Sequence, residues 1–201
     1  VALLEHLQMT PEKRFSSSEG IYYFPDPELH SAQVGIVFSG QGSQFLGMLR
    51  SSYLLDPETQ RTLQDFEKIR EQKSLASLTE LVWPPEAFDS KINQNRVNRL
   101  KQTDNAQSAL AYAHLSTAGF LKRAGLRAAG AAGHSFGELS ALSFASVIDS
   151  DTYCLLALER GRLMQESALE ESGSMMAVLG ERNLALEIFE GLTKEKGTKI
   201  V

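Results

Sequence analysis

Cysteine is nearly absent from this 201-residue sequence, which contains Cys154 alone. One cysteine excludes an internal disulfide framework and is typical of proteins from a reducing compartment. The residue lies within the apolar run 153–156, where we expect a small buried side chain rather than a reactive thiol.

Long apolar runs and an excess of basic residues are absent as well. No stretch approaches the ~20 apolar residues that a helix needs to span a bilayer. Residues 1–6 lack the basic flank and long apolar core of a signal peptide. Lysine and arginine number 20 against 25 aspartate and glutamate residues, a formal net charge of −5. Nucleic-acid-binding proteins usually carry a basic excess, so we expect neither a membrane nor a nucleic-acid partner.

The concentrated basic residues are Lys122, Arg123 and Arg127. They follow an apolar run with helical spacing, so they can stabilise the C-terminal end of a helix. The alternative is a docking site for an acidic carrier protein. The sequence leaves both interpretations open.

Methionine is missing from the first position, and residues 199–201 resemble the beginning of a strand. Both ends therefore suggest a piece of a longer chain.

Histidine is absent after the pattern G-x-S-x-G at Gly133–Gly137. The four histidines are His6, His30, His114 and His134. A serine at its ordinary pKa is a poor nucleophile and needs a neighbouring base to take its proton. The pattern suggests acyl transfer through Ser135, and the missing histidine suggests that the sequence ends before the site is complete.

The segments around Ser135 favour a nucleophilic role. The small-residue run 128–132 predicts a strand and 136–147 a helix, so Ser135 would lie at a sharp turn with its hydroxyl exposed. Glycine two residues before and after the serine fits so tight a backbone. The N–H of Phe136, at the positive end of its helix, is expected to stabilise the oxyanion of a tetrahedral intermediate.

A second oxyanion donor is expected from the loop 39–44, which follows a strand over 34–38 and opens a helix over 42–49. Its glycines let the backbone approach a ligand closely. A phosphate-binding loop is the alternative. However, Phe45 occupies the third glycine position of G-x-G-x-x-G, and no G-K-[ST] occurs.

Helix and strand patterns alternate along the chain, which predicts an α/β fold with a mostly parallel sheet. The apolar run 34–38 is typical of a strand buried on both faces. Further elements are expected as helices over 57–80, 105–121, 152–170 and 183–192 and as a strand over 174–179. A break at residues 172–173 suggests that a second subdomain begins there.

Two charged positions lead to further hypotheses. His134 and Glu138 are spaced like two metal ligands on one helical face, but no third ligand follows at suitable spacing, so we expect no metal. Arg160 lies in a helix of otherwise apolar character. It is a solvated charge, a partner of Glu159 or Glu166, or a guanidinium fork that binds a substrate carboxylate.

Four motifs in register over about residues 34–201 resemble the malonyl-CoA:acyl-carrier-protein acyltransferase family. They are Val37-Phe38-Ser39-Gly40-Gln41-Gly42-Ser43-Gln44, Thr103 through Gln107, Gly133-His134-Ser135-Phe136-Gly137-Glu138 and Arg160-Gly161-Arg162-Leu163-Met164. The first and third are similar to those of polyketide and polyunsaturated-fatty-acid synthases. The resemblance implies a hydrolase-like acyltransferase large subdomain over 33–172 and the start of a ferredoxin-like small subdomain over 173–201. Residues 1–32 would be a linker after a ketosynthase domain.

The resemblance also implies catalytic roles. Ser135 would be the acylated nucleophile, and Gln41 and Phe136 would give backbone N–H groups to the oxyanion hole. The family's general-base histidine would lie beyond Val201.

Substrate binding is implied for Arg160, which would hold the free carboxylate of malonate, for Gln107, which would line the acyl pocket, and for His134. No bound cofactor is implied. Malonyl-CoA would be the substrate, and an acyl carrier protein would bring the phosphopantetheine arm. An adjacent ketosynthase domain would be a further partner, in the cytoplasm or, for an algal protein, in the plastid stroma.

Ser39 and Ser108 depart from the family, which usually has proline at both positions. Two alternatives to the acyltransferase stay open. One is a serine hydrolase or thioesterase, which shares the turn around Ser135. The other is an inert fragment that binds an acyl-CoA or a carrier protein, because the general base is absent.

Overall fold

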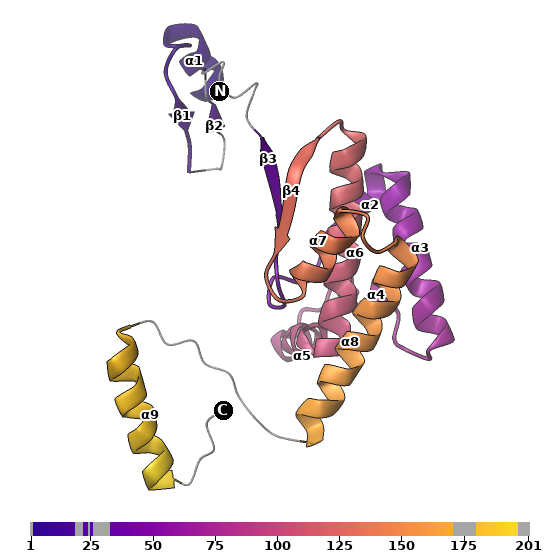
Figure 1. Cartoon of the computed structure of the whole chain (residues 1–201). Helices are drawn as coiled ribbons and strands as arrows, with labels where there is room; N and C mark the ends of the chain where they lie inside the picture. The colour runs from indigo at the N-terminus through magenta and orange to yellow at the C-terminus, as the bar shows by residue number, and fades with distance from the viewer. Residues whose placement is uncertain (1, 19–21, 24, 26–32, 171–179, 197–201) are drawn as a thin grey trace. The chain divides into compact units, whose positions relative to one another are not determined.

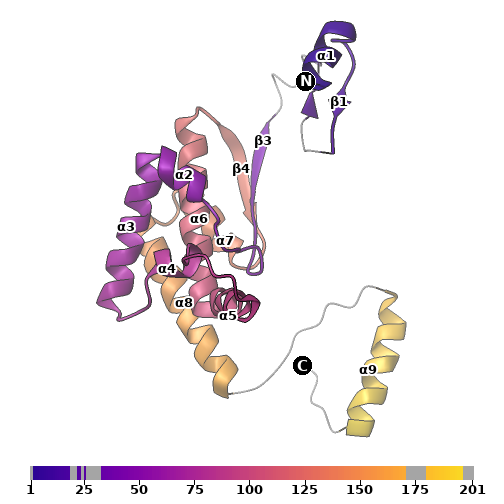
Figure 2. The same cartoon turned by 180° about the vertical axis from the view of Figure 1, so that it is seen from behind.

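The computed structural model describes residues 2–18, 22–23, 25, 33–170 and 180–196 (Figures 1 and 2). The chain divides into two units, one up to Gln165 and one from Glu166. Among the described helices, none is both long enough and apolar enough to cross a bilayer.

The N-terminal segment has its own small structure. Helix α1 (Ala2–Met9) precedes strands β1 (Phe15–Ser16) and β2 (Tyr22–Tyr23), which pair antiparallel. The His6 ring lies 5.1 Å from that of Phe15. A segment expected to be a linker thus contains regular elements, and its assignment as an interdomain linker stays a prediction.

The larger body, residues 33–165, contains a second pair of strands in its described sheet. Strand β3 (Val34–Phe38) pairs parallel with β4 (Ala128–Gly133), with Phe38 opposite Gly133. The expected α/β fold with a parallel sheet is confirmed. Burial of β3 on both faces is not, because Val37 is 78% exposed whereas Phe38 is 5% exposed. The helices of this body lie on one side of the strand pair in both views (Figures 1 and 2).

Helix α6 (Thr103–Arg123) is the central element of the core. It packs against α3 (Pro57–Gln72), α4 (Leu78–Val82), α5 (Ser90–Lys101) and α7 (Gly137–Phe144). Its residues 105–112 are all buried, and alanines at several of these positions let the neighbouring helices approach closely. A segment that is buried all round requires partners for its polar side chains.

The helix expected over 42–49 is wrong. The backbone has positive φ at Gly42 (112°), Gly47 (87°) and Leu49 (58°), and a right-handed helix cannot include such residues. The segment forms turns instead, and helix α2 (Arg50–Leu55) begins after them. The helix expected over 57–80 is likewise divided into α3 and α4, with Ser74 at φ 55° between them.

The later helices follow the sequence pattern. Helix α8 (Ser150–Glu170) and helix α9 (Arg182–Lys196) confirm the expected helices over 152–170 and 183–192. Asp149 begins α8 by accepting a hydrogen bond from the Thr152 N–H at 2.8 Å. The expected strand 174–179 and the break at 172–173 lie outside the described residues, so the ferredoxin-like subdomain stays a prediction.

Cys154 and the basic residues have structural roles. Cys154 is buried, and burial raises the pKa of its thiol to about 12, as expected for an unreactive side chain. Lys122 and Arg123 lie in the last turn of α6. The Lys122 Nζ donates to the Phe144 carbonyl at 2.8 Å, and Arg123 pairs with Asp56 at 2.6 Å. Both therefore tie the end of α6 to neighbouring segments.

A buried arginine fixes α3 against the start of α6. Arg70 is 1% exposed. Its guanidinium donates to the Ala76 carbonyl at 2.7 Å, to Ser108 Oγ at 2.8 Å and to Asn105 Oδ1 at 2.9 Å. Burial lowers the pKa of Arg70, and the nearby Asp104 and Glu67 carboxylates oppose that shift. Ser108 thus accepts a hydrogen bond that a proline at this position could not accept.

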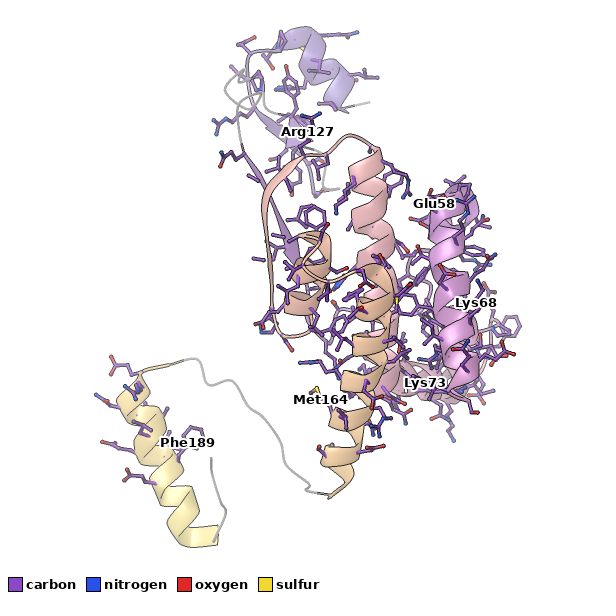
Figure 3. The ribbon with its side chains drawn as sticks, turned by 45° about the vertical axis from the view of Figure 1, so that its right-hand side comes forward. Glu58, Lys68, Lys73, Arg127, Met164 and Phe189 are labelled. Atoms are coloured by element: carbon purple, nitrogen blue, oxygen red, sulfur yellow. The ribbon has the colours of Figure 1, made fainter. Side chains whose placement is uncertain are left out.

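Replacing Arg70 by methionine should lower the free energy of unfolding by about 2–4 kcal/mol, since the buried Ser108 and Asn105 and the part-buried Ala76 carbonyl lose a charged donor. Urea denaturation measures this. Lys68→Met is the matched control, because Lys68 lies on the exposed side of α3 (Figure 3), where its pair with Asp65 is solvated. Equal losses in the two variants would contradict a structural role for the Arg70 network.

Candidate active site

Ser135 occupies a strained turn between a strand and a helix. Strand β4 ends at Gly133 and α7 begins at Gly137. Between them Ser135 has φ 54°, a left-handed conformation that is unfavourable for serine. The residue is exposed at the surface. The predicted strand–turn–helix geometry is confirmed, and it directs the hydroxyl away from the backbone of both elements.

The two flanking glycines are required by close backbone packing. A Cβ on Gly133 would lie 2.0 Å from the carbonyl carbon of Gly137, and one on Gly137 would lie 2.2 Å from the Phe38 carbonyl oxygen. Neither position can accommodate a side chain. The turn is therefore pressed against the end of β3, and the His134 N–H donates to the Phe38 carbonyl at 3.1 Å.

The glycine-rich loop after β3 lies directly against this turn. A Cβ on Gly40 would lie 2.8 Å from the His134 carbonyl oxygen and 3.3 Å from Ser135 Cβ. The Gln41 side chain extends to Thr103 Oγ1 at 3.3 Å, at the start of α6. The loop predicted to carry the second oxyanion donor is thus adjacent to Ser135.

Phe136 is the residue expected to give the first oxyanion donor. It directly precedes α7, so its N–H has no acceptor within that helix. Its ring is fully buried and packs 6.2 Å from both the His114 and the Tyr153 rings. The aromatic packing fixes the residue whose N–H follows the serine.

Arg160 lies on a face of α8 that contacts the elements of the site. Tyr153, Ala157, Arg160 and Met164 share this face by helical spacing. Tyr153 packs on Phe136 at one end of the face. Met164 projects at the other end (Figure 3), where its sulfur accepts a hydrogen bond from Gln107 Nε2 at 3.2 Å.

The guanidinium of Arg160 has no partner in the described part of the chain. Arg160 is half-buried. Glu159 instead binds Arg162 at 2.5 Å and lies 3.9 Å from Lys73. No hydrogen bond joins Arg160 to Ser135 among the described residues. Of the interpretations left open by the sequence, the pairing of Arg160 with Glu159 is not observed there.

Gln107 is held inside the core rather than on an open surface. It is 0% exposed, and its Oε1 is buried without a hydrogen-bond partner among the described residues. It does not contact Ser135. Gln107 is bonded to Met164, which lies on the same face of α8 as Arg160.

His134 is exposed at the turn, and its ring lies against Gly40. No group of three or more His, Cys, Asp or Glu side chains suited to a metal occurs among the described residues. His134 and Glu138 thus lack a third ligand there.

His114 is the residue that the sequence analysis missed. Its Nδ1 lies 2.8 Å from Ser140 Oγ on α7, and its Nε2 lies 3.2 Å from Ser39 Oγ. Ser140 is in turn 2.7 Å from the Tyr153 hydroxyl. The one available signal was a histidine within the apolar pattern of 105–121.

The environment of His114 keeps it neutral. Burial lowers the pKa of its imidazole to about 4. The ring borders a cavity of about 470 Å³ whose charged lining residues are Lys122 and Asp149. Because both ring nitrogens are already bonded to hydroxyls, His114 is unsuited to take a proton from Ser135.

Stability should fall as the pH is lowered from about 6.5 to about 4. In that window the unfolded chain protonates His114 and the folded chain does not, so the loss reaches at most about 3 kcal/mol near pH 4. Denaturation curves of the wild type and of His114→Gln at pH 7 and pH 5 isolate the effect, since the variant lacks this titration. The same pH dependence in both proteins would contradict the assignment.

Comparison with known families agrees with this geometry. Residues 36–192 match the acyl transferase domain family. The malonyl CoA-acyl carrier protein transacylase of Bacillus subtilis is 29% identical over 84% of this chain and 49% of its own length. That of Escherichia coli K12 is 34% identical over 74% of this chain and 44% of its own length. The chain thus spans about half the length of these relatives.

Solved structures give the same result. The transacylase of Streptococcus pneumoniae superposes with a TM-score of 0.63 at 27% identity, over 81% of this chain and 48% of that one. A malonyl-transacylase in complex with a type II polyketide synthase acyl-carrier protein superposes with a TM-score of 0.55 at 33% identity, over 68% of this chain and 40% of that one. The family match covers most of the sequence and includes the Ser135 turn, so this chain belongs to the acyl transferase domain family.

Proposed function

We propose that this chain carries the nucleophilic half of an acyltransferase site that moves a malonyl group from coenzyme A to an acyl carrier protein, in fatty-acid or polyketide biosynthesis. The observation that carries the proposal is the strained, exposed Ser135 beside the Gly40–Gln41 loop. The names of the related transacylases, and the relative solved with a carrier protein, support the substrate and the partner.

The proposed reaction has two steps. The Ser135 oxygen attacks the thioester carbon of malonyl-CoA while a base takes the serine proton. The carbon–sulfur bond then breaks, and the base returns the proton to the thiolate of coenzyme A. In the second step the phosphopantetheine thiol of the carrier attacks the acyl-serine in the same way. The backbone N–H groups of Gln41 and Phe136 would hold the oxyanion in both steps.

The proposal requires a general base that the described residues do not supply to Ser135. His114 is bonded to Ser39 and Ser140, and the Ser135 hydroxyl has no hydrogen-bond partner among the described residues. The hydroxyl is thus open to a base from outside the described residues.

Arg160 distinguishes this proposal from a hydrolase of neutral esters. A half-buried guanidinium that has no partner among the described residues suits a substrate that ends in a carboxylate, because Arg can hold one through two parallel hydrogen bonds. The exposed His134 would border the same substrate. Gln107 was expected to line the acyl pocket, but it is fully buried and bonded to Met164 here. The proposal also includes an adjacent ketosynthase domain as a partner. A cytoplasmic location is favoured by the single unpaired cysteine.

Incubation of the full-length protein with malonyl-CoA should add one malonyl group to the peptide that contains Ser135, as measured by mass spectrometry. Ser135→Ala should abolish the adduct, whereas Ser143→Ala should leave it unchanged. A carrier protein added afterwards should remove the group. Release to water at the same rate without carrier would favour a thioesterase, and an adduct that persists in Ser135→Ala would contradict the proposal.

Arg160→Ala should lower the rate of malonyl transfer about 10- to 100-fold. The variant loses charge-assisted hydrogen bonds worth about 1.5–3 kcal/mol, which corresponds to a loss of this size. Acetyl transfer should be spared, because acetyl-CoA has no carboxylate on its acyl group. Arg162→Ala is the matched control, since Arg162 binds Glu159 on the same helix, and both activities should be unchanged. An equal loss for malonyl and acetyl groups in Arg160→Ala would rule out carboxylate binding.

A further inference from the structure

A continuous series of hydrogen bonds connects α8 with the glycine-rich loop beside Ser135. It runs from the Tyr153 hydroxyl to Ser140 at 2.7 Å, then to His114 Nδ1 at 2.8 Å. From His114 Nε2 it continues to Ser39 at 3.2 Å, to Ser43 at 2.7 Å and to the Gly40 carbonyl at 2.9 Å. We call these five side chains the relay.

The direction of every bond in the relay follows from its last acceptor. A carbonyl can only accept, so Ser43 donates its single proton to Gly40. Ser43 must then accept from Ser39, and Ser39 must accept from the Nε2–H of His114. A neutral His114 protonated on Nε2 has a bare Nδ1, which accepts from Ser140.

The first donor completes the same pattern. Ser140 gives its proton to His114, so it accepts from the Tyr153 hydroxyl. Tyr153 is 1% exposed and Ser140 is 3% exposed, so water does not compete at this end. At the other end Ser39 and Ser43 are exposed, so water can reach them. With all five hydrogen bonds of the relay formed, one arrangement of protons is possible while His114 stays neutral.

The last acceptor, the Gly40 carbonyl, connects the relay to the proposed site. The Gly40 carbonyl and the Gln41 N–H belong to one planar peptide group and point in opposite directions. A hydrogen bond that fixes the carbonyl therefore also fixes the direction of the N–H. We propose that the relay is a positioning device that holds the Gln41 N–H toward the oxyanion site beside Ser135. This inference rests on the proposed function for the role of that N–H.

Conformational freedom in the loop makes such a device necessary. Gly40 and Gly42 flank Gln41, Gly42 has φ 112°, and the Gln41 side chain is exposed. Glycine loses more conformational freedom on folding than any other residue. Without the bond from Ser43 the peptide between Gly40 and Gln41 has fewer restraints, whereas oxyanion stabilisation requires a donor that is already oriented.

Nuclear magnetic resonance tests the relay without any assay of activity. At pH 7 the ring nitrogens of His114 should report a neutral imidazole with the proton on Nε2. The order parameter of the Gln41 amide should be near the rigid value of about 0.85 in the wild type and should fall in Ser43→Ala. Ser143→Ala, a serine that borders the same cavity but is outside the relay, should leave both signals unchanged.

Kinetics of the full-length protein test the consequence for catalysis. Ser39→Ala and Ser43→Ala should lower the rate of Ser135 acylation about 10- to 100-fold, short of the about 10²–10³-fold loss of an entire oxyanion donor. KM for malonyl-CoA should stay the same, because the oxyanion exists only in the transition state. Ser43→Thr keeps the hydroxyl and should retain activity.

The outcomes separate the relay from the proposed function. A proton on Nδ1, or an unchanged Gln41 amide in Ser43→Ala, would overturn the relay whatever the activity. Unchanged acylation rates in both alanine variants would overturn it as well. If the wild type forms no acyl-serine, the proposed function fails, and the resonance measurements alone decide whether the relay holds the loop.

Discussion

The left-handed backbone at Ser135 is the constraint on which the rest of the site depends. The turn is tight enough that a Cβ on Gly133 would meet the backbone of Gly137, and Gly137 in turn is packed against the Phe38 carbonyl at the end of β3. The same contact brings the loop after β3 next to the serine.

Around this constraint the helices hold the neighbouring residues in place. Phe136, buried between His114 and Tyr153, links the turn to α6 and α8. Arg70 fixes the beginning of α6 from the opposite side through Ser108 and Asn105. Ser39 and Ser108 stand where the related family usually has proline, and both are hydrogen-bonded here, so these departures have structural reasons.

The features that depend on neighbouring residues in the sequence could be predicted from it. The Ser135 turn follows from glycine spacing and two flanking runs, and the long helices follow from apolar spacing. The turns over 42–49 could not be predicted, because positive φ at Leu49 arises from tertiary packing. His114 could not be paired in advance, since its partner Ser39 is 75 residues away in the sequence. Arg160 was left open because only the folded helix shows that Glu159 binds other cations.

The central claim is that the Ser135 turn and the Gly40–Gln41 loop together form an acyl-enzyme site. The most direct measurement is a crystal structure of the full-length protein trapped with a malonyl group on Ser135. The account predicts that the acyl oxygen lies about 2.7–3.1 Å from the N–H groups of Gln41 and Phe136, with the carboxylate at Arg160. An acyl oxygen directed into solvent, with Arg160 unoccupied, would contradict it.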